Sequence, residues 1–133
     1  MTAMTVTADR TRFLRLALAT DAVVTGGNGL IYLAFAGPVG DLLGPDTGLL
    51  RGIGVFLLVY GAAVGFLAAR PNAAAVKAVI ALNMIWALGS IAAVVTGVIE
   101  FSTLGAVWAI AQALVVGGFA ELQIIGLRKA NRP

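Results

Sequence analysis

The sequence predicts an all-α membrane protein in which four transmembrane helices form an up-down-up-down antiparallel bundle. The 133 residues are 60% hydrophobic and 11% charged, with a mean hydropathy of +1.00, far more apolar than a soluble domain. Four apolar runs each approach the roughly 20 residues that span a bilayer, and short links between them favour antiparallel neighbours. No run shows the two-residue alternation of a membrane β-barrel, so we expect helices.

The first apolar run predicts a helix over residues 13–36, preceded by a flexible cytoplasmic tail over residues 1–12. An alternative is a secretory signal, because arginines precede the run and Ala34-Phe35-Ala36 imitates a small-residue cleavage site. Cleavage would leave three spans. We favour a retained helix, because the run is longer than a signal core and contains Asp21 and Asn28.

The other three spans follow from the same apolar character, and we predict them over residues 49–69, 74–97 and 104–127. The four helices form a single transmembrane domain, residues 13–128, and residues 129–133 form a second cytoplasmic tail. The link from Gly37 to Gly48 contains two prolines and four glycines. The sequence leaves open whether this link dips back into the membrane.

Polar residues before three of the helices are suited to cap them. A capping side chain accepts a hydrogen bond from a backbone amide in the first turn, which has no partner within the helix. The candidates are Asp46 or Thr47, Asn72, and Ser102 or Thr103.

The positive charges predict the orientation of the bundle. Eight of the nine lysines and arginines fall on one side of the predicted topology, leaving Arg51 alone on the other: Arg10, Arg12, Arg15, Arg70, Lys77, Arg128, Lys129 and Arg132. Because cytoplasmic loops carry the excess of lysine and arginine, we expect both termini in the cytoplasm and the chain in the cytoplasmic membrane.

The composition argues against several functional classes. With no cysteine and no histidine, disulfides, thiolate nucleophiles and the commonest transition-metal ligands are absent, so we expect no cofactor and no metal. The basic residues form short clusters beside apolar runs rather than an extended patch, so we expect no nucleic-acid partner. No nucleophile–base set and no phosphate-binding motif is present, so an intramembrane enzyme is the least favoured interpretation.

Polar residues within the spans are the candidate functional residues. Asp21, Thr25, Asn28 and Tyr32 recur at spacings of four, three and four, so they lie on one stripe of the first helix and should face the bundle interior. The proposed ligand-binding or ion-coupling residues are Asp21, Thr25, Asn28, Asn83, Trp86, Gln112 and Glu121. The alternative for each is a structural role, through hydrogen bonds between helices or packing of the tryptophans.

Depth in the membrane groups four of the polar residues. Counted from the cytoplasmic flanks, Asp21, Asn83, Glu121 and Gln123 fall at comparable depth in the inner half, where we expect a polar layer. Glu121 is about half a turn around the fourth helix from Gln112, so both face one groove only if that helix kinks near its glycines or meets another protomer.

Small residues on two helices predict close packing. Gly54, Gly61 and Gly65 lie on one flank of the second helix, and Gly89 and Gly97 repeat the small-residue spacing on the third. Glycines at such spacings let helix backbones approach closely in membranes. We therefore expect these five glycines at helix–helix contacts.

Two segments carry a resemblance to known proteins. The stretch Asp21–Leu30 in the first helix and the stretch Ala106–Gln112 in the fourth resemble small uncharacterised bacterial four-helix integral membrane proteins. In size and helix count the chain is also similar to DoxX-like proteins. Small multidrug exporters share four helices and one acid in the first, but their weak charge bias differs from the strong bias here. None of these resemblances implies catalytic residues.

Two functional hypotheses follow from the sequence. The first is a non-catalytic accessory or interaction subunit, with the lipid bilayer around it and a membrane-protein partner or a second copy packed on its glycine faces. The second is a small transporter or ligand-binding membrane protein with a polar cavity around Asp21 in the inner half of the membrane.

Overall fold

The computed structural model describes residues 2–130, with side chains from residue 11 onward, and this part contains five helices and no strand. The helices are α1 (Thr2–Ala34), α2 (Ala36–Leu43), α3 (Thr47–Ala69), α4 (Ala73–Thr96) and α5 (Thr103–Ala130). All but the short α2 contain a segment long and apolar enough to cross a membrane. The predicted all-α fold with four spans is confirmed, and the chain is a multi-pass membrane protein.

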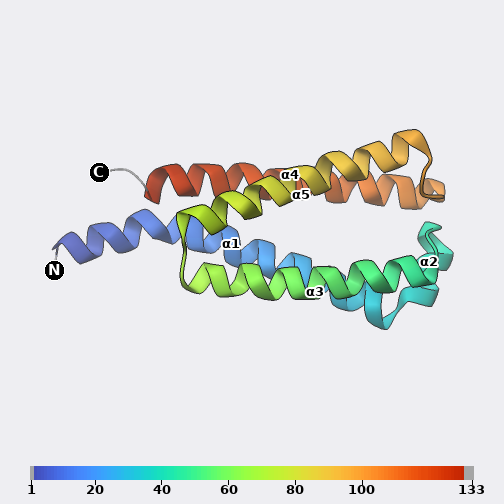
Figure 1. The fold of residues 1–133 in the computed structure, drawn as a ribbon, viewed down its shortest axis with the longest axis horizontal. Coiled ribbons are helices and arrows are strands. Elements are labelled where there is room, and N and C mark those ends of the chain that lie inside the picture. Colours follow the sequence, from blue (N-terminus) through green and yellow to red (C-terminus); the bar gives the residue numbers. More distant parts are fainter. Residues whose placement is uncertain (1, 131–133) are drawn as a thin grey trace.

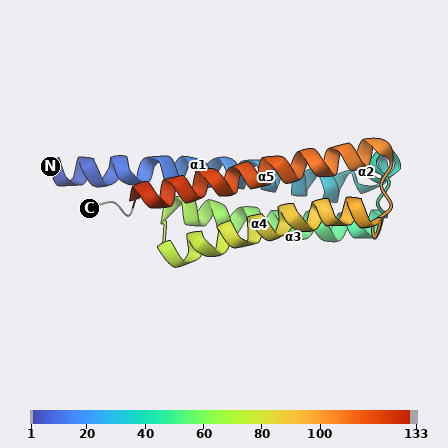
Figure 2. The same ribbon diagram turned by 90° about the horizontal axis from the view of Figure 1, so that it is seen from above.

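The four long helices run alternately up and down. Figure 1 shows the start of α1, the end of α5 and the α3–α4 link at one end of the bundle, which we call the terminal end. Helix α2 and the α4–α5 link lie at the opposite end, which we call the α2 end. Figure 2 shows the same arrangement from above, with α1 extending beyond the other helices at the terminal end.

The two ends of the chain and the first link differ in detail from the sequence prediction. Helix α1 begins at Thr2, so the backbone is helical through most of the region predicted as a flexible tail. It ends at Ala34 because Pro38 has no amide hydrogen for the Ala34 carbonyl, and its ring would clash there. The predicted link then forms α2, with Pro38 in its first turn, where no amide hydrogen is needed. Of the predicted C-terminal tail, residues 131–133 lie outside the described residues.

The predicted caps begin three of the helices. Asp46 Oδ2 accepts a hydrogen bond of 2.9 Å from a backbone amide in the first turn of α3, and Asn72 Oδ1 accepts one of 3.1 Å at the start of α4. Ser102 Oγ accepts one of 2.9 Å at the start of α5. These side chains satisfy amides that have no partner within the helix, which explains where the helices begin.

Helices α1 and α3 pack closely through glycines. A Cβ added at Gly54 would lie 2.8 Å from the Gly29 carbonyl oxygen, and one added at Gly61 would lie 2.9 Å from the Gly26 nitrogen. Both distances are too short for a side chain, so the backbones meet only because these residues are glycines. Gly54 and Gly61 therefore lie at a helix–helix contact, as predicted.

The other predicted packing glycines behave differently. A Cβ at Gly65 would lie 3.6 Å from Ala22, an ordinary contact. No described atom lies within 4 Å of a Cβ added at Gly89 or Gly97, so these two glycines make no close helix–helix contact within the bundle. Gly97 instead ends α4 with a φ of 71°, a left-handed conformation that glycine adopts without strain.

The bundle consists of two helix pairs, α1 with α3 and α4 with α5, that meet unevenly along their length. At the terminal end a cluster of apolar side chains fills the space between them: Leu14, Leu18, Val64, Leu67, Val76, Val79 and Leu127. Toward the α2 end the pairs separate, and α3 has few contacts with α4 (Figure 1). The space that opens there contains the candidate functional site.

Candidate functional site

A group of five polar side chains, which we call the polar cluster, joins all four long helices near the middle of the bundle. Its members are Asp21 and Thr25 on α1, Tyr60 on α3, Asn83 on α4 and Gln123 on α5. Asp21 and Gln123 are both 0% exposed. Asp21 lies ten residues into the 24-residue apolar segment of α1 that begins at Thr11, so its carboxylate lies near mid-span.

Hydrogen bonds connect every member of the polar cluster. Asp21 Oδ1 accepts a bond of 2.8 Å from Thr25 Oγ1, and Asp21 Oδ2 accepts bonds of 2.9 Å from Asn83 Nδ2 and 2.7 Å from Gln123 Nε2. Asn83 Nδ2 also donates to Gln123 Oε1 at 3.0 Å, and Tyr60 Oη donates to Asn83 Oδ1 at 2.9 Å. No buried side-chain polar atom in the described part lacks a partner. This network fixes the four helices in register.

The environment of the Asp21 carboxylate is polar but uncharged. Its three donors are neutral, and no lysine or arginine among the described residues pairs with it. No group of three metal-ligating side chains occurs within the described range.

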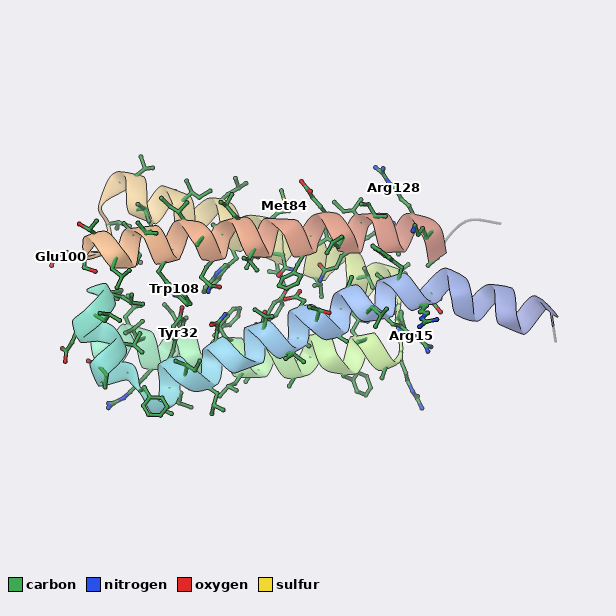
Figure 3. All side chains as sticks on the ribbon, turned by 180° about the vertical axis from the view of Figure 1, so that it is seen from behind. Arg15, Tyr32, Met84, Glu100, Trp108 and Arg128 are labelled. Atoms are coloured by element: carbon green, nitrogen blue, oxygen red, sulfur yellow. The ribbon has the colours of Figure 1, made fainter. Side chains whose placement is uncertain are left out.

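A second set of contacts lies between the polar cluster and the α2 end. Trp108 Nε1 on α5 donates a hydrogen bond of 2.8 Å to Tyr32 Oη on α1, and these side chains point toward each other across the gap in Figure 3. Asn28 Nδ2 donates to Gln112 Oε1 at 3.3 Å, which is a longer bond between the same two helices. These bonds bridge α1 and α5 where their backbones separate.

An aromatic stack bridges the opposite side, between α3 and α4. The Phe56 ring lies between the rings of Tyr60 and Trp86, with 5.7 Å between centroids in each pair. Stacked rings at this distance stabilise the contact beyond the area that they bury.

These side chains surround a cavity of about 590 Å³ in the half of the bundle nearer α2. No charged residue lines it. Most of its wall is apolar, and its polar lining residues are Thr25, Tyr32, Tyr60, Asn83, Ser90 and Gln112. Thr25, Tyr60 and Asn83 also belong to the polar cluster, so this cluster forms the floor of the cavity, with Asp21 sealed behind it. A cavity of this size and lining is typical of sites for small molecules.

The structure brings together six of the seven predicted site residues. Asp21, Thr25 and Asn83 share the polar cluster, and Asn28, Trp86 and Gln112 lie around the cavity or bridge its wall. The cavity is in the half nearer α2, whereas the sequence prediction placed it around Asp21, in the half nearer the termini. The cavity lies in the half nearer α2 because the helix pairs separate there, whereas apolar side chains fill the terminal end.

Glu121 is the predicted site residue that lies elsewhere, because its side chain is exposed. It follows Gln112 by nine residues, or two and a half helical turns, so a straight α5 carries it on the opposite face. Gln123 follows Gln112 by eleven residues, close to three full turns, and therefore faces the interior. The sequence analysis placed Gln123 in the polar layer but not among the proposed site residues, and its spacing from Gln112 is the signal that distinguishes it from Glu121.

Comparisons with known proteins add no relative to this description. The chain was compared with models of protein families, with curated proteins and with solved structures, and none of the three comparisons gave a match.

Proposed function

We propose that this membrane protein binds a small, uncharged, largely apolar molecule in the cavity between its two helix pairs, without catalysing a reaction. The observation that carries this proposal is the cavity itself, which combines a volume of about 590 Å³ with an uncharged wall and a few polar atoms. Ligand sites have this combination, because apolar walls supply affinity and a few polar groups fix orientation.

The chemistry of the wall supports binding rather than catalysis. The side chains of the polar cluster donate their hydrogens to one another. The Asp21 carboxylate lies behind the floor, where a bound molecule cannot contact it. Ser90 Oγ donates to the Trp86 carbonyl oxygen at 2.7 Å, with no base beside it among the described residues. A nucleophile paired with a base, which group transfer requires, is therefore missing from this wall.

The two tryptophans provide a direct test of the binding site. Trp86 and Trp108 are the only tryptophans of the chain, and both line the cavity. Energy transfer from tryptophan to phenylnaphthylamine, an uncharged fluorescent probe, should therefore report occupancy in detergent-solubilised protein. Anilinonaphthalene sulfonate has the same ring system with an added negative charge, and we expect it to compete poorly, because no lining residue neutralises its charge.

A matched pair of variants distinguishes probe binding in the cavity from probe binding on the lipid-facing surface. Gly89→Leu places a side chain in open space on the cavity wall, whereas Gly118→Leu adds the same side chain in open space outside it. We expect Gly89→Leu to weaken transfer to phenylnaphthylamine by about tenfold and Gly118→Leu to leave it unchanged. Equal transfer in both variants, or no saturable transfer in the wild type, would refute the proposed function.

The proposal includes an orientation with both termini in the cytoplasm, in the cytoplasmic membrane. Arg15 and Arg128 lie at the terminal end and Glu100 at the opposite end (Figure 3). Among the lysines and arginines whose side chains the structure describes, all but Arg51 belong to segments at the terminal end, which is the pattern of a cytoplasmic side. An alkaline phosphatase fused to the C-terminus should be inactive, and a fusion in the α4–α5 link should be active. The reverse pattern would overturn this orientation. The resemblance to DoxX-like proteins stays a prediction.

Glu121 favours a second candidate function, that of an accessory subunit with a partner in the membrane. Its exposed carboxylate lies seven residues, or about 10 Å along α5, before Arg128. An ionised side chain facing lipid in a span costs about 2.5–3.5 kcal/mol at the centre and less toward the interface, so a contacting partner would be favourable. A photo-crosslinking residue at position 121 should then capture a second polypeptide in the native membrane. The exposed position of Leu114 is the matched control.

A further inference from the structure

Apart from Ser90, whose hydrogen goes to the Trp86 carbonyl oxygen, the polar lining residues divide into acceptors on the floor and donors on one side. On the floor, Thr25 Oγ1 donates its hydrogen to Asp21, and Tyr60 Oη donates its hydrogen to Asn83. The amide hydrogens of Asn83 are both used, toward Asp21 and Gln123. What the floor offers a bound molecule is therefore the remaining lone pairs of these oxygens.

The wall between α1 and α5 offers the opposite polarity. Tyr32 Oη accepts the hydrogen of Trp108 Nε1, which leaves the tyrosine hydrogen available. Gln112 Oε1 accepts from Asn28, and none of the residues that the structure describes accepts the two hydrogens of Gln112 Nε2. A ligand that matches both surfaces carries a carbonyl or ether oxygen toward this wall and an N–H or O–H group toward the floor.

Three sides of the cavity are closed by specific contacts. The polar cluster closes the floor, and the Tyr32–Trp108 and Asn28–Gln112 bonds cross the side between α1 and α5. At the α2 end, Ser102 N donates to the Leu43 carbonyl oxygen at 2.8 Å, and Ser102 Oγ donates to the Leu42 carbonyl oxygen at 2.8 Å. These two bonds fasten the α4–α5 link to α2 across that end.

The remaining side, between α3 and α4, is open beyond the aromatic stack. From Phe56 and Trp86 toward the α2 end, no hydrogen bond or ring contact within the described part joins these two helices. Ile53 on α3 and Gly89 on α4 both line the cavity in this region, and a Cβ added at Gly89 meets no atom within 4 Å. Because both helices span the membrane, this opening faces lipid acyl chains rather than water.

We infer that the cavity takes its ligand sideways from the bilayer, through the opening between α3 and α4, and that this ligand is an uncharged amphiphile with one donor and one acceptor group. The inference rests on the proposed binding function and adds the route and the ligand class. An uncharged molecule that partitions into the membrane reaches this opening without crossing water. Inside the cavity, hydrogen bonds to the floor and to the wall between α1 and α5 compensate the cost of burying its polar groups.

A reversible bridge across the opening tests the route. The chain has no cysteine, so Ile53→Cys with Gly89→Cys provides one defined pair for a bismaleimide crosslinker that contains a cleavable disulfide. In bilayer nanodiscs, we expect the bridge to slow phenylnaphthylamine association and release by about tenfold each, while the equilibrium affinity stays within about twofold of the cleaved form. Cleavage of the crosslinker by dithiothreitol leaves the same adducts in place and is the matched control.

The outcomes separate the route from the binding function. Equal association and release rates in the bridged and the cleaved protein would overturn the lateral route and leave the binding function standing. Absence of saturable binding in the wild type would overturn both. The ligand class is tested by two matched naphthalenes in competition with phenylnaphthylamine. A hydroxynaphthyl ketone, with both polar groups, should compete about tenfold better than methylnaphthalene, with neither. Equal competition would overturn the assignment of donor and acceptor.

Discussion

Replacement of Asp21 by alanine tests whether the polar cluster stabilises the bundle through hydrogen bonds. The change removes the acceptor of three bonds, which at about 0.6 kcal/mol each in membrane proteins amounts to about 2 kcal/mol. The Gln123 amide then keeps a buried hydrogen without its acceptor, which costs about 1–3 kcal/mol more. Asp21→Ala should therefore lower the free energy of unfolding by about 3–5 kcal/mol.

The matched control is Asp21→Asn, which preserves the shape of the side chain and removes the ionisable group. Its amide oxygen accepts from Asn83 and Gln123, and its amide nitrogen donates to Thr25, so we expect a change within about 1 kcal/mol. Unfolding of the detergent-solubilised protein by rising fractions of sodium dodecyl sulfate, followed by circular dichroism, measures both variants. The reasoning is refuted if Asp21→Ala unfolds together with the wild type, or if Asp21→Asn is destabilised as strongly as Asp21→Ala.

Three further predictions use the same unfolding measurement. Gly54→Ala should destabilise by about 1–3 kcal/mol, because its Cβ would lie 2.8 Å from the α1 backbone, whereas Gly52→Ala, in open space, should be neutral or slightly stabilising. Ser102→Ala should lower stability by about 1–3 kcal/mol, since it loses both a helix cap and the bond to α2, and an unchanged transition would contradict that. A double-mutant cycle of Trp108→Phe and Tyr32→Phe should give a coupling energy of about 0.5–1.5 kcal/mol, and a value of zero would show that their bond does not form.

Local chemistry explains which parts of the fold were predictable from the sequence. The spans follow from apolar length, and the starts of α3, α4 and α5 follow from Asp46, Asn72 and Ser102, which act on amides a few residues away. Helical periodicity placed Asp21 and Thr25 on the buried face of α1. Each of these predictions needs only the properties of one segment.

The cavity was not predictable in this way, because it depends on the angle between two helix pairs. Periodicity identifies which face of α4 looks inward, but it does not show that α3 and α4 separate toward the α2 end, which leaves Gly89 on an open wall. Depth alone also misled the interpretation of Glu121, since residues at one depth can lie on opposite faces of a helix. Helix α2 escaped prediction because a segment rich in glycine and proline normally indicates a loop.

The glycine contact between α1 and α3 has a mechanical consequence. At this separation α1 and α3 cannot slide past each other without a backbone clash, so we expect them to move as one rigid body. We therefore expect any widening of the opening between α3 and α4 to come from movement of α4, while the hydrogen bonds of Asp21 to Asn83 and Gln123 hold α4 and α5 at mid-bundle. Distance labels on α1 and α3 should report a constant separation, while labels on the α2-end halves of α3 and α4 should report the motion.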